Sequence, residues 1–351
     1  MNMLKLNETP LRTARNFKIN NIKLENVEIP KKIEKFDNVN IINDNNNVSI
    51  KNIKNDVNIK YGVGEILINQ INEKSNVNLE INIMGKNNEN IILNFELDSK
   101  NKNLIDNINI VAKENSISNV IIKYTSKDDE VFHNGICNVI AEKNSKINIT
   151  IVNLINDVSN NFYTINNIIK EDASVNYRII DFGGKNSISN YYSNISDRAS
   201  NNVDTIYIGD KEKVLDINYI AELYGKASKI NMNVEGALND YAKKNFKGTI
   251  DFKNGCAKSI GSETEYCILL SDNVRSKSLP MLLCGEEDVE GEHSAAAGKV
   301  DAKQLFYIMS RGFSYNDALK LIIRARFNKV IKKLDEDLKN IIIEEIDRRL
   351  K

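Results

Sequence analysis

A short phrase that recurs through the middle of the chain constrains the fold more than any other feature. Each copy is a polar turn that contains a serine and precedes a strand-like apolar run. The turn serines are Ser75, Ser116, Ser145, Ser174 and Ser228. Successive serines from Ser116 to Ser174 lie 29 residues apart, and residues 146–151 alternate strictly between polar and apolar. Such alternation predicts half-buried β-strands.

Repetition at this period favours a β-solenoid, in which each coil covers the apolar row of the next. Asparagine-rich turns suit such coils, because asparagine tolerates the left-handed backbone. Helical periodicity is nearly absent from about residue 75 to residue 285, which supports strands throughout. An ordinary β-sandwich is the alternative that the pattern leaves open.

The period changes to a helical one at Asp301. Asp301 and Gln304 predict a capping box, and Gly312 predicts the end of that helix. Ser314 opens a second predicted helix, and a third amphipathic segment covers residues 334–350. The expected apolar face of the second helix consists of Ala318, Leu321, Ile322, Ala325 and Val330. These helices can cap the end of a solenoid or dock a partner.

Composition narrows the class of protein. Lys and Arg together number 48, as do Asp and Glu, so no global charge attracts nucleic acid or an anionic membrane. No apolar run approaches the length of a membrane span, and the first residues lack a secretory signal. We therefore expect a soluble cytoplasmic protein. The four cysteines form no Cys-x-x-Cys pair, which argues against a structural zinc site or a disulfide framework.

Both ends of the chain resemble a known family. The segment 292–301 reads Glu-His-Ser-Ala-Ala-Ala-Gly-Lys-Val-Asp. The other positions that carry the resemblance are Asn7, Pro10, Arg12, Thr13 and Asn20 at the start, and Gln304, Leu305, Phe306, Tyr307, Ser310, Arg311, Gly312, Asp317 and Ala318 near the end. Together they resemble the SufB/SufD family of the SUF iron–sulfur cluster assembly system, and SufD most of all.

This resemblance implies a mainly β fold with a right-handed parallel β-helix core and a C-terminal helical cap. We expect an N-terminal segment at 1–65, the β-helix at 66–300 and a helical domain at 301–351. Family members pair as SufB with SufD, or with themselves, and bind the ATPase SufC through the C-terminal helices. The residues expected to contact SufC are Gln304, Phe306, Tyr307, Arg311, Asp317 and Arg324.

ATP hydrolysis is expected in the SufC partner, because this chain lacks a P-loop. Around Gly298 and Lys299 the first glycine of that motif would fall on His293, and Val300 replaces the hydroxyl residue. The chain is therefore expected to be a scaffold, not an enzyme. No cofactor is expected to stay bound, although iron or an iron–sulfur cluster could be held transiently at the interface.

His293 is the strongest candidate ligand for that iron or cluster, since imidazole is a good iron ligand. By resemblance, it lies at the interface with SufB. Glu292 is a weaker candidate, because adjacent strand residues face opposite sides. Cys284 precedes His293 by nine residues, and a strand-turn-strand return could bring the two together.

Cys267 lies close to the position of a proposed SufB cluster cysteine and leaves a SufB-like role open. It would need thiolate character, yet Glu263 and Glu265 would raise its pKa if they lie close to it. Burial as a small apolar residue is the alternative. Cys137 and Cys256 are expected in the core.

Two further hypotheses remain at this stage. One is a homodimeric family member without an iron role, and the other is a β-helix enzyme acting on polysaccharides. A basic face on the second C-terminal helix could contact an acidic ATPase surface, and a solvent-exposed polar face is the simpler interpretation. Its residues are Arg324, Arg326, Lys329, Lys332 and Lys333.

Overall fold

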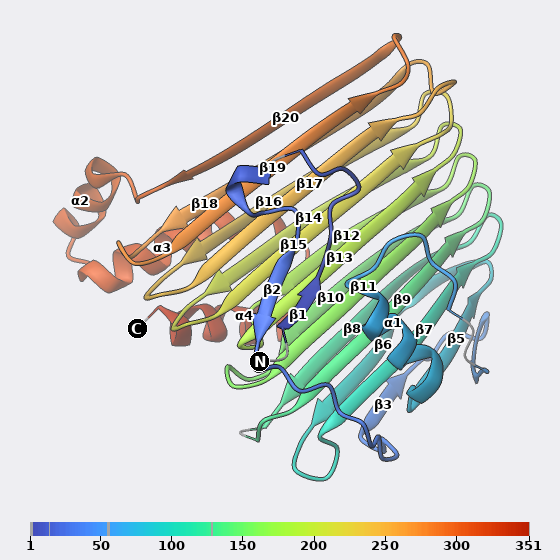
Figure 1. The fold of residues 1–351 in the computed structure, drawn as a ribbon, viewed down its shortest axis with the longest axis horizontal. Coiled ribbons are helices and arrows are strands. Elements are labelled where there is room, and N and C mark those ends of the chain that lie inside the picture. The colour runs from blue at the N-terminus through green and yellow to red at the C-terminus, as the bar shows by residue number, and fades with distance from the viewer. Residues whose placement is uncertain (1–2, 14, 55–56, 128, 351) are drawn as a thin grey trace.

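The computed structural model describes residues 3–13, 15–54, 57–127 and 129–350. They form a β-solenoid of about eight turns, and helices follow it at the C-terminal end of the chain (Figure 1). Each turn places one strand in each of two sheets, and each sheet contains nine strands in these ranges. The predicted β-solenoid is confirmed, and the β-sandwich alternative is wrong.

The two sheets are named here sheet I and sheet II. In spatial order, sheet I consists of β20 (Val289–Gly298), β18 (Ser259–Leu269), β16 (Lys229–Leu238), β14 (Ser200–Gly209), β12 (Ser174–Asp181), β10 (Lys146–Leu154), β8 (Ile117–Ser126), β6 (Lys86–Leu97) and β3 (Val39–Ile42). Sheet II consists of β19 (Arg275–Cys284), β17 (Lys243–Phe252), β15 (Val214–Leu223), β13 (Asn186–Ile195), β11 (Asn160–Ile169), β9 (Phe132–Ala141), β7 (Asn103–Ala112), β5 (Val77–Ile83) and β4 (Val48–Asn52).

Strands of successive coils pair in parallel, which explains the sequence repeat. Lys146 of β10 is in register with Ser174 of β12, so one turn of the solenoid consumes about the predicted number of residues. Within the two solenoid sheets, β3 and β4 are the described strands that pair antiparallel with their neighbours, where they close the first coil. Regular parallel stacking lets each coil bury the apolar row of the coil before it.

The turns that lead into sheet I contain one residue with positive φ in most coils. Asn115 and Asn144 take this conformation, as predicted for asparagine. Later coils use Asp172, Arg198 and Ala227 at the equivalent place. The backbone geometry of the turn therefore recurs even where the residue type changes, which is why the repeat fades toward the C-terminal end of the sequence.

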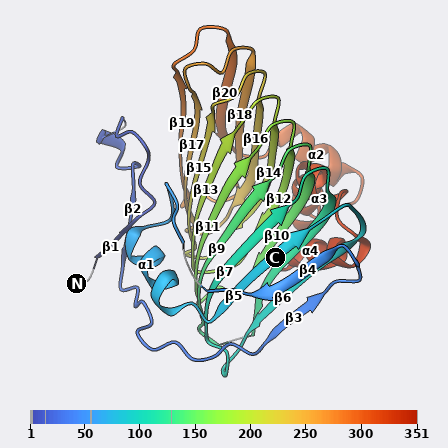
Figure 2. The ribbon, with the colours of Figure 1, turned by 90° about the vertical axis from the view of Figure 1, so that its right-hand side faces the viewer.

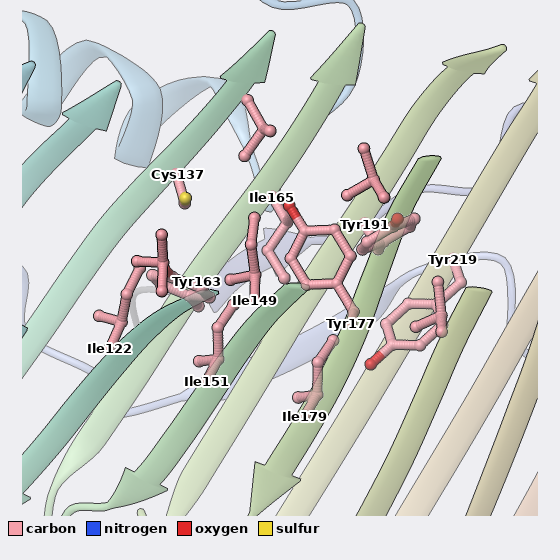
Figure 3. Close-up of a cluster of buried hydrophobic side chains, with 14 of the residues drawn as sticks. Ile122, Cys137, Ile149, Ile151, Tyr163, Ile165, Tyr177, Ile179, Tyr191 and Tyr219 are labelled. Carbon is pink, nitrogen blue, oxygen red and sulfur yellow. The ribbon is translucent and has the colours of Figure 1, made fainter. Parts of the chain in front are cut away.

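Isoleucine and tyrosine side chains fill the space between the sheets in the middle coils (Figure 3). Ile149 is fully buried, and so is Tyr191. The Tyr191 ring meets that of Tyr177 edge-on, with centroids 5.2 Å apart. Its hydroxyl donates to Asn201 Oδ1 at 2.8 Å, so the polar end of this large side chain is satisfied inside the core.

Three helices follow the solenoid: α2 (Ala302–Ser310), α3 (Tyr315–Ile331) and α4 (Glu336–Arg349). α3 and α4 cover the outer face of sheet I (Figure 2). Phe327 of α3 packs on Phe182, with ring centroids 6.2 Å apart. None of the helices in the described ranges is long and apolar enough to cross a membrane.

The expected apolar face of α3 is partly wrong. Ala318 and Val330 are buried as predicted, but Leu321 is 38% exposed. Ile323 and Phe327 are fully buried instead. The helix is rotated so that Ile323, Phe327 and Val330, at spacings of four and three, pack on the apolar outer face of sheet I. The helix sequence alone does not show which face of the helix this sheet covers.

The predicted helix ends are largely confirmed. Asp301 caps α2 by accepting from the backbone N–H groups of Lys303 and Gln304 at 2.7 and 3.0 Å. The return bond expected from the Gln304 side chain is not formed among the described residues. Gly312 has φ +96° after α2, and Ser314 caps α3 by accepting from Asp317 N–H.

The part of the chain before β3 lies on the opposite side of the solenoid, along the outer face of sheet II (Figure 2). It contains β1 (Met3–Leu6), a short 3₁₀ turn (Arg15–Phe17) and β2 (Ile22–Glu25), and α1 (Glu65–Lys74) follows. Asn7 holds this segment on sheet II by two hydrogen bonds. Its side chain donates to Asp216 Oδ1 at 2.7 Å, and its backbone carbonyl accepts from Lys247 Nζ at 2.7 Å. Lys247 and Asp216 form a fully buried ion pair beneath it.

Candidate functional site: the last coil and the C-terminal helices

His293 lies on β20, the terminal strand of sheet I (Figure 1). It is in register with Glu263 of β18, so the two backbones are about 4.8 Å apart and both side chains are on the inner face. No further coil covers this face, and His293 is exposed. The imidazole therefore stands at the open end of the solenoid.

Glu292 faces the other way, as expected for the neighbour of His293 on a strand. It is in register with Ser262, whose hydroxyl donates to Glu292 Oε1 at 2.8 Å. The carboxylate is thus on the outer face of sheet I, away from the imidazole. A joint role of Glu292 and His293 in holding one ion gains no support from this arrangement.

Cys267 lies inside the solenoid and is fully buried. It lies four positions after Glu263, the register partner of His293, on β18, a distance of roughly 13 Å along the strand. Burial raises the pKa of the Cys267 thiol, and Glu265 adds to this as expected, while Lys244 opposes it. These conditions favour the neutral thiol over the thiolate that sulfur transfer or iron binding requires.

Cys284 ends β19 and is exposed. It is in register with Phe252 of β17. A four-residue turn and four residues of β20 separate it from His293. The structure therefore does not bring Cys284 and His293 side by side. Cys137 and Cys256 are fully buried, as predicted for core cysteines.

Directly beneath the last coil lies a buried carboxyl group with no partner. Glu263 is 1% exposed, and neither of its carboxyl oxygens has a hydrogen-bond partner among the described residues. Burial, reinforced by the nearby Glu265, raises the pKa of Glu263 to about 8. Gly248 provides the space, since a Cβ there would lie 2.1 Å from Glu263 Oε1. Glu263 is thus a largely protonated acid at neutral pH.

Glu265, the other buried glutamate on β18, has partners for both of its carboxylate oxygens. It forms an ion pair with Lys244 at 2.8 Å, and both side chains are completely buried. Tyr207 and Ser278 donate to its two oxygens at 3.0 and 2.8 Å. A buried ion pair with every acceptor satisfied holds a fixed geometry. The sequence predicted neither the role of Lys244 nor the inward direction of Glu263. Residues 262–265 read Ser-Glu-Thr-Glu, so no apolar residue there marks the strand face that points into the solenoid.

The C-terminal helices present an exposed apolar surface. α2 buries none of its residues, and Phe306 and Tyr307 are 72% and 58% exposed. Arg311 lies over the Tyr307 ring, 5.2 Å from its centroid, and donates to the Tyr307 hydroxyl at 3.2 Å. Gln304 is also exposed. These four expected partner-binding residues therefore lie on one solvent-facing helix and the turn that ends it.

The other two expected partner-binding residues have partners inside the chain. Asp317 accepts from Ser314 Oγ at 2.6 Å at the start of α3, and Arg324 pairs with Asp347 of α4. The rest of the basic face on α3 mostly meets sheet I: Arg326 lies 3.9 Å from the Tyr266 ring centroid, and Lys329 binds Asp204 at 2.7 Å. A wholly solvent-exposed basic face is therefore wrong, because these cations hold α3 on the solenoid.

No group of three or more His, Cys, Asp or Glu side chains within 3–13, 15–54, 57–127 and 129–350 is arranged to hold a metal ion. His293 accordingly stands as a single imidazole next to the protonated Glu263. What the last coil offers chemically is one imidazole ligand on an open surface, above a buried acid that can release a proton when its surroundings change.

Comparison with known proteins identifies a family and several relatives. The family described as SUF system FeS cluster assembly, SufBD core domain, matches residues 95–326. The iron–sulfur cluster assembly protein SufD of Bacillus subtilis is 27% identical over 260 residues, which cover 72% of this chain and 59% of that protein. SufD of Escherichia coli is 31% identical over 114 residues, which cover 32% of this chain and 27% of that protein.

An archaeal relative, the SufBD family protein PH1385 of Pyrococcus horikoshii, is 26% identical over 149 residues, or 42% of this chain and 33% of the relative. The chain thus spans between about a quarter and three fifths of these relatives. The matched family region runs from β6 through most of α3 and so includes the last coil and α2. This protein therefore belongs to the SufB/SufD family of the SUF system for iron–sulfur cluster assembly.

Proposed function

We propose that this chain is a non-enzymatic, SufD-like scaffold subunit of an iron–sulfur cluster assembly complex. It pairs with a SufB-type paralogue through its last coil and binds a SufC-type ATPase through its C-terminal helices. Iron or a nascent cluster is its transient cargo, and His293 is the ligand that the chain contributes. The proposal rests on one observation: His293 on the uncovered last coil and the aromatic residues of α2 are both exposed to solvent.

The last coil supports pairing with another β protein. β20 ends sheet I and β19 ends sheet II, so both strands have a free edge among the described residues. A free strand edge presents backbone N–H and C=O groups that another strand can pair with. A partner that covers this end would also enclose His293 and Glu263, and it would have to supply the remaining ligands of any iron bound there.

The surface of α2 supports docking of a separate subunit. Phe306 and Tyr307 are large and exposed, and Arg311 lies over the Tyr307 ring. Aromatic residues with arginine are typical anchors of protein interfaces. α3 and α4 anchor the region to sheet I, so α2 projects from a fixed base. A SufC-type ATPase is the proposed occupant of this surface.

The alternative, a SufB-like or homodimeric protein that uses Cys267 as the sulfur site, has weaker support. The Cys267 thiol is buried inside the solenoid, and its surroundings raise its pKa. A reactive cysteine normally needs access and a lowered pKa. The free edges of β19 and β20 would serve pairing with a second copy as well as with a paralogue.

Co-expression with a SufC-type ATPase and a SufB-type paralogue tests the docking part of the proposal. The double variant Phe306→Ala/Tyr307→Ala should lose the ATPase from the purified complex and keep the paralogue. Its unfolding free energy should change by less than about 0.5 kcal/mol, because both side chains are exposed. Point substitutions are preferable to a truncation at Val300, which would strip α3 and α4 from sheet I.

Ile66→Ala is the matched control, since Ile66 is 52% exposed on α1, which packs on the outer face of sheet II, away from α2. It should leave both partners bound. Retention of the ATPase by the double variant at wild-type levels would contradict docking through α2. Failure of the wild-type chain to bind either partner would contradict the scaffold assignment as a whole.

A further inference from the structure

A cavity of about 310 Å³ lies between the outer face of sheet I and the C-terminal part of α3. Its charged lining residues are Arg178 and Asp204 from the sheet and Lys329 and Lys333 from the helix and the turn that follows. Asparagine amides complete the wall. The cavity is named here the Arg178 pocket. It is separate from His293 and from α2.

The charges in the Arg178 pocket do not balance. Asp204, whose side chain is 8% exposed, binds Lys329 at 2.7 Å and Lys333 at 3.1 Å. Arg178 is its register neighbour on β12. One carboxylate therefore faces three cations and leaves a surplus of two positive charges. The C-terminal end of α3 contributes about half a negative charge at most, so a surplus of about 1.5 remains.

Arg178 also has unused hydrogen-bond donors. Its Nε is buried and has no partner among the described residues. Its Nη1 reaches Thr150 Oγ1 only at 3.5 Å, the limit of a hydrogen bond. Burial lowers the pKa of Arg178, and Asp204 opposes this, but a guanidinium stays charged at neutral pH. Buried donors of a charged group without an acceptor are costly, so an acceptor is missing here.

The asparagine wall is rigid and offers more donors. Each amide donates to the oxygen of the amide on the preceding coil: Asn148 to Asn119 at 2.8 Å, Asn176 to Asn148 at 3.1 Å and Asn202 to Asn176 at 2.8 Å. These bonds use one N–H of each amide, and each Nδ2 has two. The ladder therefore keeps amide donors beside the guanidinium in a fixed arrangement.

We infer that the Arg178 pocket binds a doubly charged tetrahedral oxyanion of the phosphate type. Arginine matches phosphate oxygens with paired N–H donors, and the two lysines supply the rest of the charge. The cavity holds the volume of roughly ten water molecules, so it accepts free phosphate or the phosphate group of a small molecule. Because the lysines come from the α3 side and Arg178 from the sheet, the bound anion joins the helical region to the solenoid.

This inference does not depend on the proposed function, and inorganic phosphate is the probe that tests it. Isothermal titration calorimetry of the full chain at pH 7 and constant ionic strength should show saturable binding with one site per chain. Sodium chloride in place of phosphate should give no saturable heat. A phosphate monoester in a third titration distinguishes a free-anion site from a site for a phosphorylated molecule. Absence of saturable binding by both phosphate and the monoester would overturn the inference.

Variants locate the site. Arg178→Gln should raise the dissociation constant at least tenfold, and Lys333→Gln, which alters an exposed side chain, should raise it severalfold. Lys332→Gln is the matched control, because Lys332 is exposed and does not line the cavity. Asp204→Asn removes the only carboxylate of the lining and should tighten binding severalfold. Mere structural damage cannot tighten binding, so weaker binding by Asp204→Asn, or an unchanged constant in Arg178→Gln, would contradict the assignment.

Discussion

The interior of the middle coils differs sharply from the interior of the last coil. In the middle coils Ile149, Ile151 and Tyr191 fill the space between the sheets, and further coils stack on both sides of them (Figure 3). At the end of the solenoid the inner face carries Glu263, Lys244 and other polar groups. One region is a closed core that is mainly apolar and encloses the His133–Asp106 pair completely, and the other is an open surface with ionisable groups beneath it.

The difference shows which part of a solenoid is free to carry function. A middle coil must match the apolar rows of both neighbours, so its inward positions are restricted to close-packed side chains. The last coil has only one neighbour, which leaves the inner face of β20 uncovered and allows an imidazole at His293. The polar groups below it lower the stability of the core locally. This loss of stability is limited because the Glu265–Lys244 pair has all its hydrogen-bond acceptors satisfied.

The largest expected effect tests the closed middle coils. Ile149→Ala removes a fully buried side chain between stacked coils and should lower the unfolding free energy by about 3 to 4 kcal/mol. The matched substitution Leu282→Ala, on half-buried β19, should cost only about 1 kcal/mol. Urea unfolding monitored by circular dichroism measures both. Equal losses would show that the last coil is packed as tightly as the middle ones.

A second effect, on the order of a few kcal/mol, tests the buried acid below the last coil. The unfolded chain ionises Glu263 near pH 4.5, whereas the folded chain keeps it protonated up to about pH 8. Stability from the protonated form is therefore complete below pH 4.5 and is lost as the pH rises to 8. Glu263→Gln removes this loss, so the variant should gain stability over wild type steadily between pH 4.5 and 8.

Unfolding free energies measured across this pH range check the prediction. Glu292→Gln serves as the control, because Glu292 is exposed on the outer face of the same coil and should leave the pH profile unchanged. Parallel pH profiles for Glu263→Gln and wild type would mean that Glu263 ionises normally in the folded protein. The open end would then be more accessible to water than the structure indicates.

Local sequence signals predicted most of the fold. The serine turns and alternating runs placed the strands, since a parallel coil needs the same turn and the same inward row each time. Asp301 and Gly312 marked helix ends because capping depends on one or two residues. The packing face of α3 was mispredicted at Leu321 and Ala325, because the rotation of a helix depends on the sheet that it covers.

The candidate site was less predictable. His293 was found through its surrounding motif, and its exposure and inward direction follow from its place on the terminal strand. Glu263 and Glu265 were noticed only as neighbours of Cys267 in sequence, because glutamate on an alternating polar strand gives no sign of facing a core. Lys244 lies on the opposite sheet, and its pairing with Glu265 exists only once the coil is closed.

The most direct test of the central account measures iron and acid-labile sulfide in the complex with the SufB-type paralogue and the SufC-type ATPase. His293→Ala is compared with Ser294→Ala, which alters the neighbouring exposed position on β20. Both variants should assemble with the partners and unfold like wild type. If the last coil holds the cargo through His293, the histidine variant should lose most of its iron and sulfide and the serine variant should keep them. Wild-type iron and sulfide in an intact His293→Ala complex would contradict the account.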